Sequence, residues 1–399
     1  MEHLEKPSQS YMDFFLNNHR PNQNDRKEKE SIHDSIVTTI KGTCNSMCPS
    51  EEINFRKRER MVHILEVVGN KQKLVKSYSR PAADTNLALP HNLRPFHVLK
   101  DTVDYLLFEV TKRTDASSLV IYNFVTDRLR AVRQDMIIQD LPAELRVTLL
   151  EPMIRFHVYY GYLLCESPVN DYSPILNRNI LLECLKTCLY SYDEMECKNS
   201  DTCNMSFLIN NMDKCSLGEK DHELGGNRDL VEALYVLTTL YEESPMWRLR
   251  RLSQNVRHSP AVRLAYRLAA AALRGHYATV SRLVQRLCPL TFCAVVLLLP
   301  TLQRRALQVM CAAYSARGRG VPLGAVRAWL CAADAAAARA LLRHYGLPDA
   351  DGLLGCRRGG FREDAPLHSP TKITAEHLEG KMNIDYILTY TSRDTLNFK

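Results

Sequence analysis

The sequence predicts a mainly α-helical protein whose C-terminal part ends in a winged-helix subdomain. Beyond residue 40, apolar residues recur at positions i, i+3 and i+4, which is the spacing of one face of a helix. Prolines and glycines fall between these periodic segments, where they start or stop helices. After Gly346 the helical pattern gives way to a glycine-containing hairpin pattern, and three helices followed by a small β wing make a winged helix.

The composition excludes several classes of protein. The 399 residues are 45% hydrophobic and 24% charged, which is typical of globular proteins and excludes collagen-like and wholly disordered chains. The 13 cysteines are an odd number in a chain too large to depend on disulfides, so we expect reduced thiols. The most apolar run, Leu290–Leu299, is about half the roughly 20 residues of a membrane span, and the N-terminus lacks a signal-peptide pattern. We therefore expect a soluble protein without membrane insertion.

The N-terminal half is expected to contain a tail and a helical region. Residues 1–40 are polar and charged and predict a disordered tail. Residues 41–300 form the expected helical region, which begins with a helix over Glu51–Val68 after Pro49. Residues 193–227 are acidic, rich in asparagine and end in two glycines, which predicts a surface loop. The other helices expected up to residue 241 are His97–Lys112, Ala116–Gln139, Leu145–Cys165, Asn177–Tyr192 and Asp229–Tyr241.

The composition changes sharply at Trp247. From there to Arg358 the chain has 18 Arg, no Lys and three Asp, a formal charge of +15, so the rest of the chain carries −8. Two explanations remain open: the codon bias of a GC-rich coding sequence, or a basic surface that attracts phosphates and acidic peptides. The helices expected in this stretch are Ala261–Leu273, Ala278–Leu287, Leu302–Ser315, Leu323–Ala332 and Asp334–Tyr345.

Residues 301–362 form the expected winged helix. Asp334 is placed to cap its third helix, Gly346 to end it, and Leu353–Phe361 to form the hairpin. Residues 363–399 are expected to be weakly ordered. A basic face for nucleic acid or a partner is predicted on the third helix and the wing, with a solvated surface as the alternative, and its members are Arg339, Arg343, Arg357 and Arg358.

A metal site is not predicted. Cys44 and Cys48 have the C-x-x-x-C spacing of half a zinc site, but a complete site needs a matching second pair. Cys184 and Cys188 are one helical turn apart on an apolar face, which favours packing in the core.

Catalytic residues and a cofactor are not predicted either. The sequence has no phosphate-binding glycine loop, no zinc-protease motif and no nucleophile elbow. Cys165 with His157 would be a conceivable nucleophile and base, but both lie in an apolar helix without an evident orienting carboxylate. Buried structural side chains are the favoured interpretation.

The charged string from Asp127 to Asp135 lies on a predicted helix. Its favoured interpretation is a set of ion pairs along that helix, such as Asp127 with Arg130, and the alternative is a clamp between helices or a partner surface. Arg155 stands in an apolar stretch and is expected to pair with a buried acid.

Five ordered motifs resemble the SAC-three/GANP family. They are GTCNSMCP at 42–49, KSYSRPAA at 76–83, LRP at 93–95, FVTDRLRAVRQD at 124–135 and RFH at 155–157. The resemblance covers about residues 40 to 360, although Thr126 stands where relatives often have Arg. It implies that the first and fourth motifs hold the helical stack together. The motif residues given this structural role are Cys44, Met47, Cys48, Pro49, Arg80, Pro81, Asp127, Arg128, Arg130, Arg133, Gln134, Asp135 and Arg155.

The resemblance also implies a fold and a class of function. The expected fold is of PCI type: stacked helical hairpins, a helical repeat, ending in a winged helix. Family members are scaffolds and not enzymes. They hold a second PCI-domain protein and a small acidic subunit of the Sem/Dss type, and their winged helices can present a basic surface to RNA.

Two pathways follow from the resemblance. Large members organise the transcription-coupled mRNA export complex at nuclear pores, but we expect neither an FG-repeat region nor a long centrin-binding helix in this chain. In length and layout it is similar to short members, which are associated with centrosome duplication and spindle assembly. We therefore expect a scaffold at the centrosome and spindle of the cytoplasm that supports mitosis and cell division. The alternative is an adaptor of nuclear mRNA export.

Overall fold

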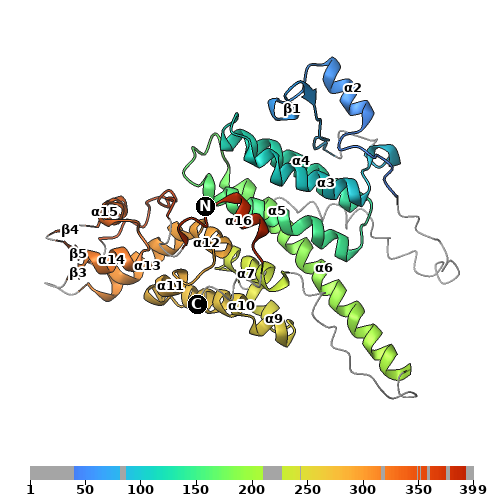
Figure 1. The fold of residues 1–399 in the computed structure, drawn as a ribbon. Coiled ribbons are helices and arrows are strands. Elements are labelled where there is room, and N and C mark those ends of the chain that lie inside the picture. The colour runs from blue at the N-terminus through green and yellow to red at the C-terminus, as the bar shows by residue number, and fades with distance from the viewer. Residues whose placement is uncertain are drawn as a thin grey trace, which may run out of the picture. The chain divides into compact units, whose positions relative to one another are not determined.

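The computed structural model describes residues 40–80, 87–209, 227–242, 244–315, 320–347, 349–350, 352–356, 360–373 and 378–391. It is mainly helical, as predicted (Figure 1). The predicted tail over residues 1–39, the motif residue Pro81 and the wing residues Arg357 and Arg358 lie outside the described residues. The chain from Lys41 to Lys399 forms one compact unit.

The first predicted helix is wrong beyond Arg58. Helix α2 ends there because Arg60 adopts a left-handed backbone conformation with φ of 55°, which breaks the helical path. A short hairpin then turns at Gly69, whose φ is 59°. The elements of this part are α2 (Ser50–Arg58), η3 (Ile64–Glu66), β1 (Val67–Val68), β2 (Lys71–Gln72) and η4 (Pro90–Asn92).

The next three helices lie within a few residues of their predicted bounds. The hydroxyl of Ser117 accepts a hydrogen bond from the backbone N–H of Val120 and so caps the helix that begins at Ser118. Both α4 and α5 are rich in buried apolar side chains, and residues 153–162 of α5 are buried on every side. The elements are α3 (Phe96–Phe108), η5 (Val110–Lys112), α4 (Ser118–Ile138) and α5 (Ala143–Leu163).

The predicted surface loop over residues 193–227 is wrong in its first half. Helix α6 (Pro174–Ile209) continues through residues 193–209, and residues 210–226 lie outside the described part. The acidic residues that suggested a loop are paired on this helix. Asp193 accepts from Arg228 at 2.6 Å and from Arg248 at 2.9 Å, and Glu196 accepts from Arg228 at 2.9 Å.

Three of the following helices carry no clear sequence signal. Helices α8 and α9 have six and five residues, and all eight residues of α12 are buried, so that helix has no polar face to create a period. Within the described residues no single helix is long and apolar enough to cross a membrane, and the one pair of helices that qualifies jointly is bent by 64°. The elements are α7 (Arg228–Thr238), α8 (Ser244–Leu249), α9 (Gln254–His258), α10 (Pro260–Leu273), α11 (Tyr277–Val284) and α12 (Pro289–Val296).

The part after α12 has its own hydrophobic cluster. Its three-stranded antiparallel sheet has the order β3-β5-β4, and Val321 lies opposite Leu354. The carboxylate of Asp334 caps its last helix by accepting from Ala337 N at 2.7 Å, and Gly346, with φ of 75°, ends it, both as predicted. The elements are α13 (Leu299–Ala313), β3 (Gly320–Pro322), α14 (Leu323–Trp329), α15 (Ala335–His344), β4 (Asp349–Ala350) and β5 (Leu353–Gly355).

The predicted hairpin over Leu353–Phe361 is shifted in the structure. The observed hairpin joins β4 to β5 and turns near Gly352. The φ of Gly352 is 74°, a left-handed backbone conformation that favours glycine. Phe361 lies outside the strands and stacks on Tyr345 at 5.0 Å between ring centroids. The sequence therefore predicted a glycine-containing hairpin in this region, but not which residues form its two strands.

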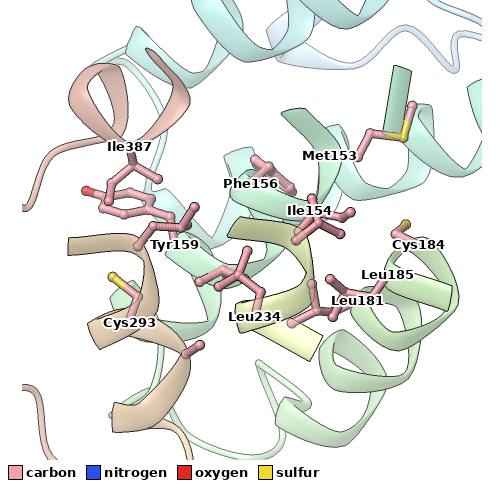
Figure 2. Close-up of a cluster of buried hydrophobic side chains, with 14 of the residues drawn as sticks. Met153, Ile154, Phe156, Tyr159, Leu181, Cys184, Leu185, Leu234, Cys293 and Ile387 are labelled. Carbon is pink, nitrogen blue, oxygen red and sulfur yellow. The ribbon is translucent and has the colours of Figure 1, made fainter. Parts of the chain in front are cut away.

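Helix α5 lies at the centre of the main core. Figure 2 shows Ile154, Phe156 and Tyr159 of α5 among side chains of α6, α7 and α12. The last helix, α16 (Ile384–Thr389), also packs on α5 and contributes Ile387 to this core. The expectation of a weakly ordered segment over residues 363–399 is therefore wrong for residues 378–391, where Leu378, Ile387 and Tyr390 are buried.

Candidate functional site

Asp135, near the C-terminal end of α4, is the centre of a buried charge network. Its Oδ1 accepts a hydrogen bond from Lys76 Nζ at 2.7 Å, and its Oδ2 accepts from Arg94 Nε at 2.7 Å. Asp135 and Arg94 are fully buried, and Lys76 is 4% exposed. Two buried cations thus share one carboxylate, which joins three segments that are distant in the sequence.

The N-terminal loop, residues 41–49, is attached to this network. The carbonyl oxygen of Met47 accepts from Arg94 Nη1 at 3.2 Å and from the backbone N–H of Lys76 at 2.9 Å. The N–H of Gly42 donates to Gln139 Oε1 at 2.8 Å. A Cβ atom on Gly42 would lie 2.4 Å from the carbonyl oxygen of Leu93, so this close approach requires glycine.

The cysteines of this loop are buried thiols. Burial, assisted by the negative charge of Glu52, raises the pKa of the Cys48 thiol far above its usual value. Cys44 Sγ donates to the carbonyl oxygen of Ser46 at 3.3 Å, and Pro49 occupies the residue before α2. Within the described ranges no group of three or more His, Cys, Asp or Glu side chains could hold a metal ion.

A second buried carboxylate, Glu66, was missed by the sequence reasoning. It accepts from Arg56, from Arg128 Nη2 at 3.3 Å, and from the backbone N–H groups of His63 at 3.0 Å and Val75 at 3.1 Å. Burial alone would raise the pKa of Glu66, but these donors outweigh it and hold the pKa below its ordinary value. The only sequence signal was an acid between two apolar residues, within a segment predicted as helix.

The charged string on α4 contacts mainly other segments, with one pair inside the string. The predicted pair of Asp127 with Arg130 is wrong, since the Arg130 guanidinium lies over the ring of Tyr78 at 4.0 Å. Asp127 accepts from the backbone N–H of Tyr78 at 3.2 Å and pairs with Arg128 at 2.5 Å. These contacts tie α4 to the chain around residue 78, which agrees with the alternative of a clamp.

Two further residues of the string extend the clamp, and one motif residue does not join it. Gln134 Nε2 donates to the carbonyl oxygen of Ser79 at 2.9 Å, and Arg133 pairs with Glu183 of α6 at 2.9 Å. Arg80 is exposed. The structure thus brings the first and fourth sequence motifs together through Lys76, Arg94 and Asp135, and leaves Arg80 at the surface.

Arg155 on α5 holds the C-terminal segment. Its Nη1 donates to the carbonyl oxygens of Tyr390 and Ile387, the latter at 3.3 Å. Its expected acidic partner is present but distant, since Glu151 Oε2 lies 3.9 Å from Nη2. The guanidinium therefore acts chiefly as a donor to backbone carbonyls from α16.

His157 is a buried structural residue in a hydrogen-bonded cluster. Its Nδ1 lies 2.9 Å from Asn177 Oδ1, and Asn177 Nδ2 donates to the His157 carbonyl oxygen at 3.0 Å. Burial lowers the pKa of His157 to about 4, and burial raises the pKa of Cys165 to about 11. A neutral imidazole that bonds an amide and a protonated thiol are unsuited to nucleophilic catalysis.

The His157 cluster predicts a dependence of stability on pH. Because the folded-state pKa of about 4 lies below the ordinary 6.5, the unfolded chain binds a proton that the folded chain excludes. The stability that is present above pH 6.5 should therefore be lost as the pH falls towards 4, by about 3 kcal/mol in total. Urea unfolding between pH 7 and 4 measures this loss. His157→Gln should flatten the slope, whereas the exposed His91→Gln should not, and equal slopes for both variants would contradict the assignment.

The predicted basic face can be placed only in part. Arg339 and Arg343 lie on α15, one helical turn apart, and both are exposed. Arg343 Nε donates to the carbonyl oxygen of Arg339 at 3.4 Å. Arg357 and Arg358 lie outside the described residues.

Comparison with known proteins gives one family and several relatives. The family model described as SAC3/GANP family matches residues 47–350. The chain is similar to Protein xmas of Drosophila melanogaster, with 32% identity over 39% of this chain and 8% of that protein. It is also similar to SAC3 family protein B of Arabidopsis thaliana, with 35% identity over 32% of this chain and 8% of the relative. SAC3 family protein 1 of Schizosaccharomyces pombe is 34% identical over 34% of this chain and 13% of the relative. The matched region thus spans about a tenth of the length of these relatives.

Proposed function

The chain belongs to the SAC3/GANP family, and from that premise we propose that it is a non-catalytic scaffold of PCI type that positions protein partners. Four of the five sequence motifs that suggested the family contribute a residue to the Asp135 network: Met47, Lys76, Arg94 and Asp135. The thiols and the imidazole considered for chemistry are held by burial in unreactive protonation states, which favours a structural role for them.

One observation carries the proposal: a stack of packed helices is followed by a smaller unit with its own core. That unit has the order helix α13, strand β3, helices α14 and α15, then strands β4 and β5, with β5 central in the sheet. This order supports our proposal of a winged helix that follows a helical repeat. We infer that the winged helix pairs with that of a second PCI-domain protein.

Charge suggests a further partner. The Trp247–Arg358 stretch carries +15, which favours association with a small acidic subunit of the Sem/Dss type. Such a subunit would add the negative charge that this half of the chain lacks.

The proposed pathway is centrosome duplication and mitotic spindle assembly, with the protein located at the centrosome and spindle of the cytoplasm. This part rests on the resemblance of the sequence to short family members. The test is depletion of the protein followed by counting of centrosomes and spindle poles, with rescue by the wild-type chain. Normal centrosome number and spindle shape after depletion would refute it.

A second candidate function is an adaptor of nuclear mRNA export, favoured by the two exposed arginines on α15. Purification of the tagged chain at moderate salt, with mass spectrometry, separates the two. Recovery of centrosomal and spindle proteins supports the first function, whether or not a PCI partner is recovered with them. Poly(A) RNA retained in the nucleus after depletion, without recovery of centrosomal and spindle proteins, supports the second.

The second candidate makes a prediction for RNA binding. Replacing Arg339 and Arg343 by Glu should abolish RNA affinity, because contacts with phosphates release counterions and provide most of the nonspecific binding free energy. The measurement is the slope of log K against log salt for a labelled oligouridylate, with a control in which the exposed Arg274 and Arg327 are replaced by Glu. If the α15 variant still binds RNA with the wild-type affinity, Arg339 and Arg343 are not the RNA-binding residues and the prediction is contradicted.

A further inference from the structure

A pocket lined by arginines lies between α10 and the segment that leads into α12. It has a volume of about 290 Å³, and its charged lining consists of Arg263, Arg267, Arg286 and His258. We call these four residues and the apolar side chains of Leu264 and Leu287 between them the basic pocket. Nothing in the scaffold function requires a cavity here.

The arginines of the basic pocket have no anionic partner among the described residues. Arg263, Arg267 and Arg286 are exposed and form no ion pair within the described part of the chain. This differs from Arg248 in the same basic stretch, which pairs with Asp193 at 2.9 Å and with Glu232 at 2.7 Å. The fold thus provides carboxylates for one arginine of this stretch and none for the three around the cavity.

The positions of the arginines are fixed by helix geometry. Arg263 and Arg267 are four residues apart on α10, so they lie on the same face, one turn apart. Ser259 caps this helix by accepting from Val262 N at 3.3 Å, which orders its first turn. Arg286 reaches the pocket from beyond the end of α11, so cations from two elements meet at one cavity.

The backbone adds to this positive field. Cys288 and Thr291, which also line the cavity, are the N-cap residue and a first-turn residue of α12. The N-terminal end of a helix carries a partial positive charge and favours an anion. Like charges gathered around one cavity repel each other, and a bound anion relieves that repulsion.

The choice of arginine points to phosphate. A guanidinium presents its donors in a planar fork that fits two phosphate oxygens, whereas lysine binds as a point charge. Three guanidinium groups around one small cavity match a dianionic group better than a single carboxylate. Clusters of arginine are the general means by which proteins bind phosphorylated side chains.

The lining favours a peptide over RNA. Single-stranded nucleic acid requires aromatic side chains on which bases stack, and no Phe, Tyr or Trp lines this cavity. Pro260 and Leu264, which are not buried, instead offer an apolar surface to the residue next to the phosphate. We propose that the basic pocket binds the phosphate group of a phosphorylated serine or threonine in a partner protein.

This inference goes beyond the proposed scaffold function and is tested with the purified full chain. The probe is a fluorescein-labelled pool of nonapeptides with phosphoserine at the centre and uncharged residues at random elsewhere. The reference probes are the same pool with unmodified serine and a labelled oligouridylate of 12 nucleotides. Binding is measured by fluorescence anisotropy at about 0.15 M salt, close to physiological ionic strength.

The expected result is that the phosphorylated pool binds at least about tenfold more tightly than the serine pool, since charge-assisted bonds to phosphate are the stronger ones. Replacing Arg263, Arg267 and Arg286 by Gln should remove this difference. The matched control replaces Arg274, Arg282 and Arg327 by Gln, which removes the same charge from exposed positions outside the pocket. The control should retain the wild-type preference to within about twofold, because screening weakens distant surface charges.

Three results would overturn the proposal. They are equal binding of both peptide pools, an unchanged preference in the pocket variant, and loss of oligouridylate binding without any preference for phosphoserine. Thermal melting of each variant checks that it is folded. If the triple variant melts early, Arg267→Gln alone is compared with Arg274→Gln, since single exposed substitutions change stability little.

Discussion

Replacing Asp135 by Asn is expected to destabilise the protein by about 3–5 kcal/mol, which is the usual result of removing one partner from a buried ion pair. Lys76 and Arg94 would both remain buried, and their shared counterion would be gone. The variant amide would also present an N–H donor to one of these cations. Urea unfolding of the purified chain, followed by circular dichroism, measures the change in the free energy of unfolding.

The matched control is Asp104→Asn. Asp104 also accepts from a lysine, Lys100, at 2.6 Å, but both side chains are about half exposed. Exposed pairs contribute little, so this variant should stay within about 0.5 kcal/mol of wild type. A change of similar size in both variants would mean that burial of Asp135 does not matter, and that the N-terminal loop is held by other contacts.

Replacing Arg155 by Met is expected to release the C-terminal segment, residues 378–391, from α5. The carbonyl oxygens of Ile387 and Tyr390 would lose a charged donor while still facing the core. Loss of such hydrogen bonds costs about 1.5–3 kcal/mol each, so we expect a loss of about 2–4 kcal/mol after methionine fills part of the space. Hydrogen exchange measured by mass spectrometry should show faster exchange in residues 384–389.

The matched control is a substitution in an exposed ion pair that also connects this segment to the rest of the chain. Lys112 pairs with Asp385 at 2.8 Å, with both side chains about half exposed. Lys112→Met should leave exchange in α16 unchanged, because an exposed pair contributes little. If Arg155→Met also leaves α16 protected, the apolar contacts of Ile387 and Leu388 hold the segment without the arginine.

The long helices could be predicted from the sequence alone. The bounds of α4 and α5 were within a few residues because each helix is 21 residues long and carries apolar side chains along its whole length, although residues 153–162 of α5 are buried on every side. The glycine and aspartate signals around α15 were also local and correct. The same local reasoning failed for α12, which is buried on all sides, and for the second half of α6, whose acidic residues are paired by distant arginines.

The candidate site was predicted as a set of residues but not as a set of contacts. The motifs named Asp127, Arg128, Arg133 and Asp135 correctly as a group on one helix. Their partners Tyr78, Glu66, Glu183 and Lys76 are 49 to 62 residues away, and no periodicity relates positions at such separations. The one pair that local spacing suggested, Asp127 with Arg130, is absent from the described structure.

The sequence by itself determined the family, the mainly helical class and the position of the basic stretch, because each depends on composition or on short motifs. Only the tertiary structure decided that Arg155 holds the C-terminal segment, that Asp135 anchors the N-terminal loop, and that three arginines surround one cavity. The physical reason is that helix formation depends on neighbours within a few residues. A buried charge, in contrast, needs a partner that is close in the folded structure, and that partner can be distant in the sequence.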